Sequence, residues 1–333
     1  MKLFILSNNI NRASFRQRIG VYLKMLHSKN IDCEIAKLPS GLLSSRKVFQ
    51  RAADFDCVFL HKKVLNPISA FLLRKYSKKI IYNFDDAVMY DPDQPNRTSG
   101  PHMKRFIRSV KVADMVLVGS SYLAEQARKY NSNINVLPLG LKVSDYKIDC
   151  PPKSDDKIRL VWIGSKSTLK YLEELKPTLE EIGSLFNNVV LRIIGDGFFD
   201  LQNMEVEKRL WSKKTRAVDL ATSDIGLAPL PDNRFTKGKC SFKVLEYASA
   251  GLPVIASPVG TNSDYIRNNV TGFFARDSKE WIDRIAQLIN NPQSRKKVGQ
   301  DGRTWAKNFD VSVIGKQLTD LIGQCLKDDV LLK

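Results

Sequence analysis

The amino-acid sequence predicts an α/β protein with two doubly wound parallel sheets. Short apolar runs alternate with helical patterns along the whole chain, which is typical of strands that helices cover on both faces. The alternation is interrupted once, by the proline-containing charged stretch 147–157, which we interpret as a linker. A length of 333 residues also exceeds the commonest size of a single domain.

The elements follow in order in both halves of the chain. Before the linker, strands are expected at 3–6, 57–60, 80–84, within 112–120 and at 134–140, with helices at 16–29, 68–76 and 121–130. After it, strands are expected at 158–164, 189–195, 225–230 and 253–257, with helices at 172–186, ending in 218–224, and at 242–251, 280–291 and 312–326. This order predicts an N-terminal domain 1–146, a linker 147–157, a C-terminal domain 158–308 and a final segment 309–333 whose helix packs back toward the N-terminal domain.

The chain is strongly basic, with a net charge of +18. Residues up to position 150 carry +13 of this excess. Such a charge indicates a polyanionic partner, such as an anionic membrane surface or a phosphorylated ligand. A nucleic-acid partner is not expected, because the basic residues are dispersed and no nucleic-acid-binding motif occurs.

The five cysteines are widely spaced and form no metal-binding or disulfide pattern, which favours reduced thiols and a cytoplasmic location. The start of the chain has too short an apolar run for a signal peptide, and no uncharged run is long enough to span a bilayer. We therefore expect a soluble or peripheral protein without a bound metal.

Ligands of open parallel sheets bind outside the carboxyl ends of the strands. If the two predicted domains face each other, these ends line one cleft. The chemically useful residues at the predicted strand ends are Ser7, His61, Asp85, Asp86, Gly164, Gly195 and Asp232.

Many of the candidate binding residues lie in the stretch 224–260, which is expected to form a strand, a loop, a helix and a second strand. Its loop contains Lys237, Gly238 and Lys239, the helix begins near Ser241, and Lys243 lies in its first turn. Backbone N–H groups at a helix start, with lysines nearby, can bind a diphosphate. The alternative is a solvated basic loop before a core helix.

The sequence LEYASAGLPVIAS in this stretch resembles the donor-binding segment of retaining glycosyltransferases with the GT-B fold, family four of that class. The resemblance implies that Glu246 binds the ribose hydroxyls of a nucleotide sugar. The family has another Glu eight residues earlier, where this chain has Gly238. The alternative for Glu246 is a helix-surface residue paired with Lys243.

Two further segments extend the resemblance. In 160–180, Gly164 is followed by Lys166 and Lys170, one of which would take the place of the family's Arg and Lys beside the diphosphate. In RIIGDGF, Gly195 ends a strand that lies near the nucleotide in the family. The alternative for Lys166 and Lys170 is that they are solvated surface lysines. The alternative for Gly195 is an ordinary tight turn.

Acceptor-side residues are expected in the N-terminal half. The strand before Asp85 and Asp86 resembles the Asp-Asp-Ala strand end of polysaccharide glycosyltransferases, whose carboxylates hold acceptor hydroxyls; an Asp that caps the next helix is the alternative. The other candidates are Ser14, Arg16, His61 and His102, whereas Arg12 and Arg18 are expected to be surface charges.

The resemblance implies a glycosyltransferase that moves a sugar, with retention and without a metal, from a UDP- or GDP-linked donor to a glycan or lipid-linked acceptor in cell-surface polysaccharide or lipopolysaccharide synthesis. Lys239 and Lys243 would stabilise the leaving diphosphate. The basic groups 62–63, 74–75, 78–79 and 104–111 predict docking of the N-terminal domain on the inner face of the cell membrane. The alternatives are a nucleotide-sugar epimerase of the same fold, a catalytically weak homologue and a polyanion-binding protein.

Overall fold

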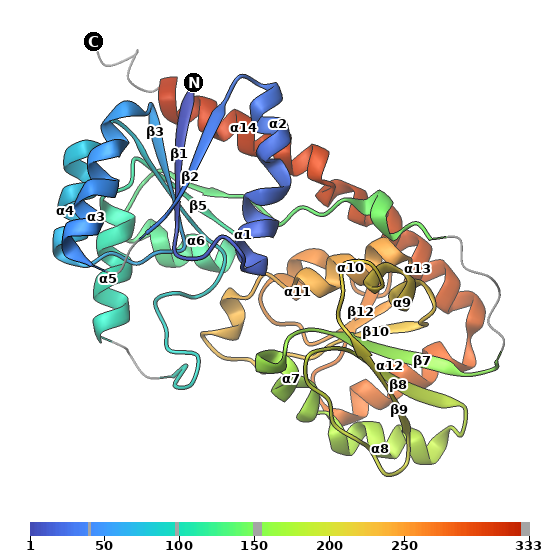
Figure 1. Ribbon diagram of the computed structural model, residues 1–333. Helices are drawn as coiled ribbons and strands as arrows, with labels where there is room; N and C mark the ends of the chain where they lie inside the picture. The colour runs from blue at the N-terminus through green and yellow to red at the C-terminus, as the bar shows by residue number, and fades with distance from the viewer. Residues whose placement is uncertain (39–40, 97–99, 149–154, 328–333) are drawn as a thin grey trace. The chain divides into compact units, whose positions relative to one another are not determined.

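The computed structural model describes residues 1–38, 41–96, 100–148 and 155–327 (Figure 1). The chain divides into two compact units. Unit 1 consists of Met1–Gly140, Asn233–Cys240 and the segment from Val311 onward, and unit 2 consists of Leu141–Asp232 and Ser241–Asp310. Each unit contains one parallel sheet with helices around it, which confirms the predicted α/β class.

The sheet of unit 1 has the strand order β2-β1-β3-β4-β5-β6. Its strands are β1 (Lys2–Ser7), β2 (Asp32–Lys37), β3 (Cys57–His61), β4 (Ile80–Phe84), β5 (Met115–Val118) and β6 (Ile134–Val136). Ser7 pairs with His61, and His61 pairs with Asn83. The carboxyl ends of the three central strands therefore lie in one row.

Successive residues of these strands pack into two different cores. Phe4, Val58 and Tyr82 belong to one buried cluster, whereas Ile5 and Phe59 belong to another. Because side chains alternate between the two faces of a strand, both faces of this sheet are covered. This explains why β1, β3 and β4 appear in the sequence as continuous apolar runs.

Helices of unit 1 cover both faces of its sheet. They are α1 (Ala13–Arg18), η1 (Gly20–Tyr22), α2 (Leu23–Ser28), α3 (Leu42–Gln50), η2 (Arg51–Asp54), α4 (Pro67–Tyr76), α5 (Gly100–Lys111), α6 (Ser121–Arg128), η4 (Thr236–Gly238) and α14 (Val311–Lys327). The single helix predicted at 16–29 is wrong: the chain forms three short helical pieces there, and the break comes next to Gly20, a poor helix former. Buried residues of α14, including Ile314 and Leu318, join the same core as β1 and β3.

The sheet of unit 2 has the strand order β12-β11-β10-β7-β8-β9. Its strands are β7 (Ile158–Ile163), β8 (Val189–Gly195), β9 (Glu205–Leu210), β10 (Ile225–Ala228), β11 (Val254–Ala256) and β12 (Gly272–Phe274). Ile163 pairs with Ile194, so the turns that follow β7 and β8 lie next to each other. These turns contain Gly164 and Gly195.

The helices of unit 2 are η3 (Val143–Tyr146), α7 (Lys166–Glu173), α8 (Lys176–Leu185), α9 (Arg216–Ala221), α10 (Phe242–Ala250), α11 (Thr261–Tyr265), α12 (Ser278–Asn290), α13 (Pro292–Ala306) and η5 (Lys307–Phe309). The prediction of one helix at 172–186 is wrong. Pro177 lies in the first turn of α8, where backbone N–H groups have no partner within the helix, so a proline is tolerated there. The residues up to Glu173 belong to a separate helix, α7. Among the described residues, no helix is both long and apolar enough to cross a membrane.

Candidate functional site

Unit 1 gathers Ser14, His61, Lys62 and Asp85 where β3 and β4 end. Ser14 Oγ donates to Asp85 Oδ2 at 2.9 Å and lies 3.2 Å from His61 Nε2. Lys62 Nζ lies 3.0 Å from Asp85 Oδ1 and also forms an ion pair with Asp86. The structure therefore brings four of the predicted residues together, namely Ser14, His61, Asp85 and Asp86, and adds Lys62.

Both ring nitrogens of His61 lie within hydrogen-bond distance of a side-chain oxygen. Asn83 Nδ2 donates to Leu117 O at 3.1 Å, and Asn83 Oδ1 lies 3.1 Å from His61 Nδ1. His61 thus links Asn83 to Ser14, whose Oγ lies 3.2 Å from Nε2. Burial lowers the pKa of His61 to about 4, with further lowering from the cationic Arg18, so the ring is neutral at pH 7.

The two adjacent carboxylates differ in exposure. Burial alone would raise the pKa of Asp85, but the charges of Lys62 and Arg18 outweigh it and hold this pKa below its usual value. The Asp85 side chain is 7% exposed and that of Asp86 is 34% exposed. Asp85 is thus an internal anion held by its neighbours, and Asp86 is the more exposed of the two carboxylates.

The loop 233–240 packs on the same region of unit 1. A Cβ built on Gly238 would lie 2.6 Å from Ala87 Cβ, so only glycine allows this close approach. Cys240 Sγ donates to Asp85 O at 2.8 Å, and Phe235 packs against the core of the unit. These contacts place Lys237, Gly238 and Lys239 beside the Asp85–Ala87 turn.

Other basic and imidazole side chains of unit 1 have different places. Arg16 is exposed and donates to Asn11 O at 2.6 Å, and His102 is exposed on α5. The prediction that Arg18 is a surface charge is wrong: its side chain is buried, 2% exposed, and donates to Leu137 O. The expectation that Lys62 faces a membrane is also wrong, because its ammonium pairs with Asp85 and Asp86.

Unit 2 holds Glu246 on the buried side of α10. Tyr146 Oη donates to Glu246 Oε1 at 2.8 Å, and Arg216 Nε lies 3.6 Å from the same oxygen. Burial raises the pKa of Glu246, while Tyr146 and Arg216 oppose the increase. The alternative of a helix-surface Glu is wrong, since this residue is 7% exposed.

The next residue, Tyr247, anchors α10 to the sheet. Its hydroxyl donates to Leu227 O at 3.2 Å and accepts from Ile163 N at 2.9 Å. A Cβ on Gly226 would lie 2.5 Å from the ring, so this strand approaches α10 closely. Gly251, with a φ of 80°, ends the helix as predicted. These contacts fix α10 against the sheet and thereby fix the position of Glu246, which lies on the same helix.

The start of α10 and the turns after β7 and β8 meet around Trp162. Lys243 Nζ lies 4.0 Å from the centroid of the Trp162 ring, a cation–π contact. A Cβ on Gly164 would lie 2.5 Å from the same ring, and one on Gly195 would lie 2.5 Å from Gly164 O. Ser241, the residue before α10, has a left-handed backbone with a φ of 39°. The structure therefore brings together Ser241, Lys243, Gly164 and Gly195, close to Glu246 on the same helix.

The other predicted residues of unit 2, Lys166, Lys170 and Asp232, make different contacts from the residues around Trp162. The backbone N–H of Lys166 donates to Asp196 Oδ1, so a carboxylate already lies at the start of α7. Lys170 Nζ lies 5.6 Å from the ring centroid of Tyr171, and Asp232 is exposed. A negative charge at this helix start opposes a phosphate there.

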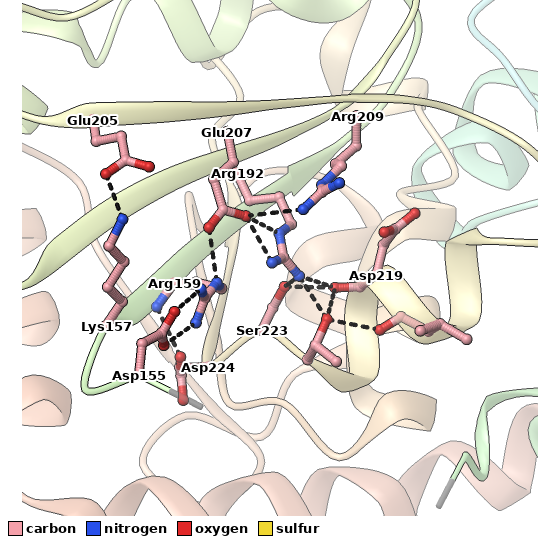
Figure 2. Close-up of polar contacts among 12 residues, drawn as sticks. Asp155, Lys157, Arg159, Arg192, Glu205, Glu207, Arg209, Asp219, Ser223 and Asp224 are labelled. Carbon is pink, nitrogen blue, oxygen red and sulfur yellow. Dashed lines mark hydrogen bonds and ion pairs between the residues drawn. The ribbon is translucent and has the colours of Figure 1, made fainter. Parts of the chain in front are cut away.

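The sequence did not indicate Tyr146 and Arg216 as site residues. Figure 2 shows the polar network of Arg192, which holds the end of the helix that begins with Arg216. The buried Arg192 pairs with Glu207 and donates to Asp219 O at 2.7 Å, and further to Thr222 and Ser223 at the end of α9. A cation at the carboxyl end of a helix stabilises it. Arg192 thereby holds α9, whose first residue is Arg216. No motif marks these residues, because their partners are far away in the sequence.

Comparisons with known proteins agree with this fold. Residues 157–291 match the family model of glycosyl transferases group 1. Glucosyltransferase 3 of Streptococcus parasanguinis is 20% identical over 300 residues, which is 84% of this chain and 82% of that protein.

Two solved structures share the fold over nearly the whole chain. Anabaena HepE, in complex with UDP and glucose, has a TM-score of 0.73 at 17% identity, covering 97% of this chain and 100% of that one. Sucrose-phosphate synthase from Thermosynechococcus elongatus has a TM-score of 0.75 at 13% identity, covering 97% and 98%. The two parallel-sheet units thus confirm the predicted GT-B fold, and the chain is identified as a glycosyltransferase whose residues 157–291 match the family model of glycosyl transferases group 1.

Proposed function

We propose that this enzyme transfers a sugar from a UDP-linked donor to a hydroxyl of a glycan or lipid-linked acceptor, with retention of the anomeric configuration. The observation that carries the proposal is the buried Glu246, held at Oε1 by Tyr146 and Arg216. With Oε1 held in this way, the second oxygen, Oε2, would accept hydrogen bonds from the vicinal hydroxyls of a ribose. UDP is preferred over GDP because the structurally similar HepE was solved with UDP.

Lys243 and the start of α10 are proposed to stabilise the leaving group. When the bond between the anomeric carbon and the diphosphate oxygen breaks, negative charge develops on that oxygen. The N–H dipoles at a helix start and a nearby ammonium are favourable to such a charge. Lys243 is already fixed over Trp162 at 4.0 Å, so little ordering is required when the donor binds.

Asp86 is proposed to accept the hydrogen bond of the acceptor hydroxyl. Its side chain is 34% exposed, and Lys62 orients it from the buried side. Asp85, Ser14 and His61 then act as positioning residues, because their polar atoms are engaged with one another. The proposed role of Asp86 is consistent with its place two residues after the end of β4, at the carboxyl end of a central strand.

We further propose that unit 1 docks on the inner face of the cytoplasmic membrane, where the acceptor serves surface-polysaccharide synthesis. On α4, Ile68 is 52% exposed and Phe71 is 65% exposed, and Lys75 on the same helix is exposed too. Exposed apolar and basic side chains on one helix favour binding to an anionic membrane surface.

Titration with UDP, GDP and uridine, followed by transfer assays with a panel of UDP-sugars, tests the proposal. We expect UDP to bind more tightly than GDP and uridine, and the Glu246→Ala enzyme to lose UDP affinity. The exposed Glu181→Ala on α8 is the control and should bind UDP as the unmodified protein does. Equal affinity of both variants for UDP would overturn the assignment of Glu246.

The resemblance to retaining enzymes implies that no metal is needed. Among the described residues, no group of three His, Cys, Asp or Glu side chains is placed to hold a metal ion. We therefore propose that transfer persists in the presence of EDTA, and a loss of activity that Mg²⁺ or Mn²⁺ restores would contradict this.

A further inference from the structure

A cavity of about 420 Å³ lies within unit 1, separate from the polar group around Asp85. Its walls come from the segment after β4, from α5, from the region of α6 and from the loop 233–240. The lining residues are Tyr90, Met103, Phe106, Tyr122, Gln126, Lys129, Tyr130, Arg234 and Lys237. The functions proposed above do not use this cavity.

Hydrogen bonds and ring contacts hold the walls of the cavity together. Tyr122 Oη donates to Arg234 O at 3.2 Å, which ties the loop 233–240 to α6. Tyr90 Oη donates to Gln126 Oε1 at 3.5 Å, and Phe106 meets the edge of Tyr130 with ring centroids 6.4 Å apart. The cavity is thus a formed feature of unit 1, as is usual for small-molecule sites.

The chemistry of the lining points to a particular class of ligand. Lys129, Arg234 and Lys237 contribute three positive charges, and none of the described residues that line the cavity is acidic. Arg and Lys side chains bind phosphate and carboxylate groups through charge-assisted hydrogen bonds. The three tyrosines combine apolar faces with hydroxyls, and the amide of Gln126 adds a donor and an acceptor. Such a lining matches a sugar ring that carries an anionic group.

The position of the cavity connects it with the acceptor. Tyr90 is four residues after Asp86, and Lys237 precedes Gly238, which packs against Ala87. A sugar bound in this cavity is therefore near the carboxylate that we propose for the acceptor hydroxyl.

We propose that this cavity binds an anionic sugar unit of the acceptor, bearing a phosphate or a carboxylate. The inference rests on the proposed function only in calling this sugar part of the acceptor. Binding of the sugar itself depends on unit 1 alone and can be measured without transfer. A phosphate on a lipid-linked sugar and the carboxylate of a uronic acid are the two possible sources of the anion.

Calorimetric titration with α-D-glucose 1-phosphate, D-glucuronate and D-glucose tests the proposal. We expect at least one of the two anionic sugars to bind at least tenfold more tightly than glucose, and the tighter of the two identifies the anion. Arg234→Gln and Lys129→Gln should each weaken this binding at least fivefold. Arg128→Gln, an exposed arginine adjacent to Lys129 that does not line the cavity, should leave it unchanged.

Several outcomes would overturn the inference. These are no binding of either anionic sugar, binding no tighter than that of glucose, or binding that Arg234→Gln does not alter. Competition by UDP that disappears in Arg234→Gln would instead make the cavity a nucleotide site. UDP affinity is measured in parallel: if UDP binds and the anionic sugars do not, this inference alone fails, and if the sugars bind and UDP does not, the proposed function fails.

Discussion

The hydroxyl of Tyr146 donates a hydrogen bond of 2.8 Å to Oε1 of Glu246, a residue one hundred positions later in the chain. Arg216 Nε donates to the same hydroxyl at 3.1 Å and lies 3.6 Å from the same carboxylate oxygen. Both contacts are to Oε1, so Oε2 is the oxygen that we propose for the ribose hydroxyls. Burial makes this carboxylate costly to ionise, and the two partners offset part of that cost.

Replacing Glu246 and replacing its partner should affect UDP binding differently. We expect Glu246→Ala to weaken UDP binding by about tenfold to a hundredfold, because a hydrogen bond to a charged group contributes about 1.5–3 kcal/mol. Tyr146→Phe should weaken binding less. It should also raise the pKa of Glu246 further, since Tyr146 lowers it, so UDP affinity of this variant should recover as the pH rises. A pH-independent defect in Tyr146→Phe would argue for a purely structural role.

Lys243→Met should reduce turnover more than it reduces uridine binding. The ammonium over Trp162 is proposed to stabilise charge on the diphosphate, which uridine lacks. The preference for UDP over uridine should therefore decrease by about tenfold, as expected for one charge-assisted hydrogen bond. Lys176→Met is the matched control, because Lys176 lies over Phe199 at 4.4 Å in the same unit but on α8. Equal losses for UDP and uridine would show that Lys243 only holds the helix.

The neutral, buried His61 should make the protein less stable in acid. Its pKa is about 4 in the folded chain against an ordinary value of 6.5, so only the unfolded chain binds a proton between these values. Stability should therefore decrease as the pH falls from about 6.5 to 4, by about 3 kcal/mol in total. His61→Gln cannot titrate, and its urea-unfolding free energy should decrease less over this range. Parallel pH profiles for the two proteins would contradict the assignment.

Arg192→Met should destabilise the protein. The substitution removes one of the three cations paired with Glu207, which keeps Arg159 and Arg209, and it takes from Asp219 O a donor at 2.7 Å; losing these buried contacts costs about 1–3 kcal/mol. Figure 2 shows that the same guanidinium also binds the end of α9, so UDP affinity should decrease through Arg216. Lys208→Met removes an exposed pair with Asp200 and should change stability by about 1 kcal/mol or less. Denaturant unfolding of both variants measures the difference.

Phe71→Ser should weaken binding to anionic vesicles if α4 faces the membrane. Phe71 is 65% exposed, and moving an aromatic side chain out of the lipid interface loses about 1.5–3 kcal/mol. Co-sedimentation with anionic and neutral vesicles at two salt concentrations measures the change. Val218→Ser, an exposed apolar residue of unit 2, is the control. If the two variants sediment alike, α4 is not the contact.

The sequence identified the central strands of both sheets and missed three of the edge strands. β3 and β4 are buried throughout and were predicted within a residue of their ends. β2 and β9 contain charged residues at alternate or adjacent positions, β12 is only three residues long, and none of these was predicted. An edge strand lacks a neighbour on one side and needs no continuous apolar run, so composition alone does not reveal it.

For the candidate site, the sequence by itself determined which residues stand at strand ends and helix starts. His61, Asp85, Gly164 and Gly195 follow buried runs, and Glu246 lies in a recognisable segment. The order of apolar and polar residues along the chain is enough for this, because it shows where each buried strand ends.

Only the tertiary structure decided what those residues contact. Arg18 and Lys62 are as basic as any surface residue, yet the fold buries Arg18 and pairs Lys62 with Asp85 and Asp86. Tyr146 and Arg216 reach Glu246 across 100 and 30 positions of the chain. A charge can be buried only where a partner from another element compensates it, and the choice of that partner depends on packing rather than on the neighbouring sequence.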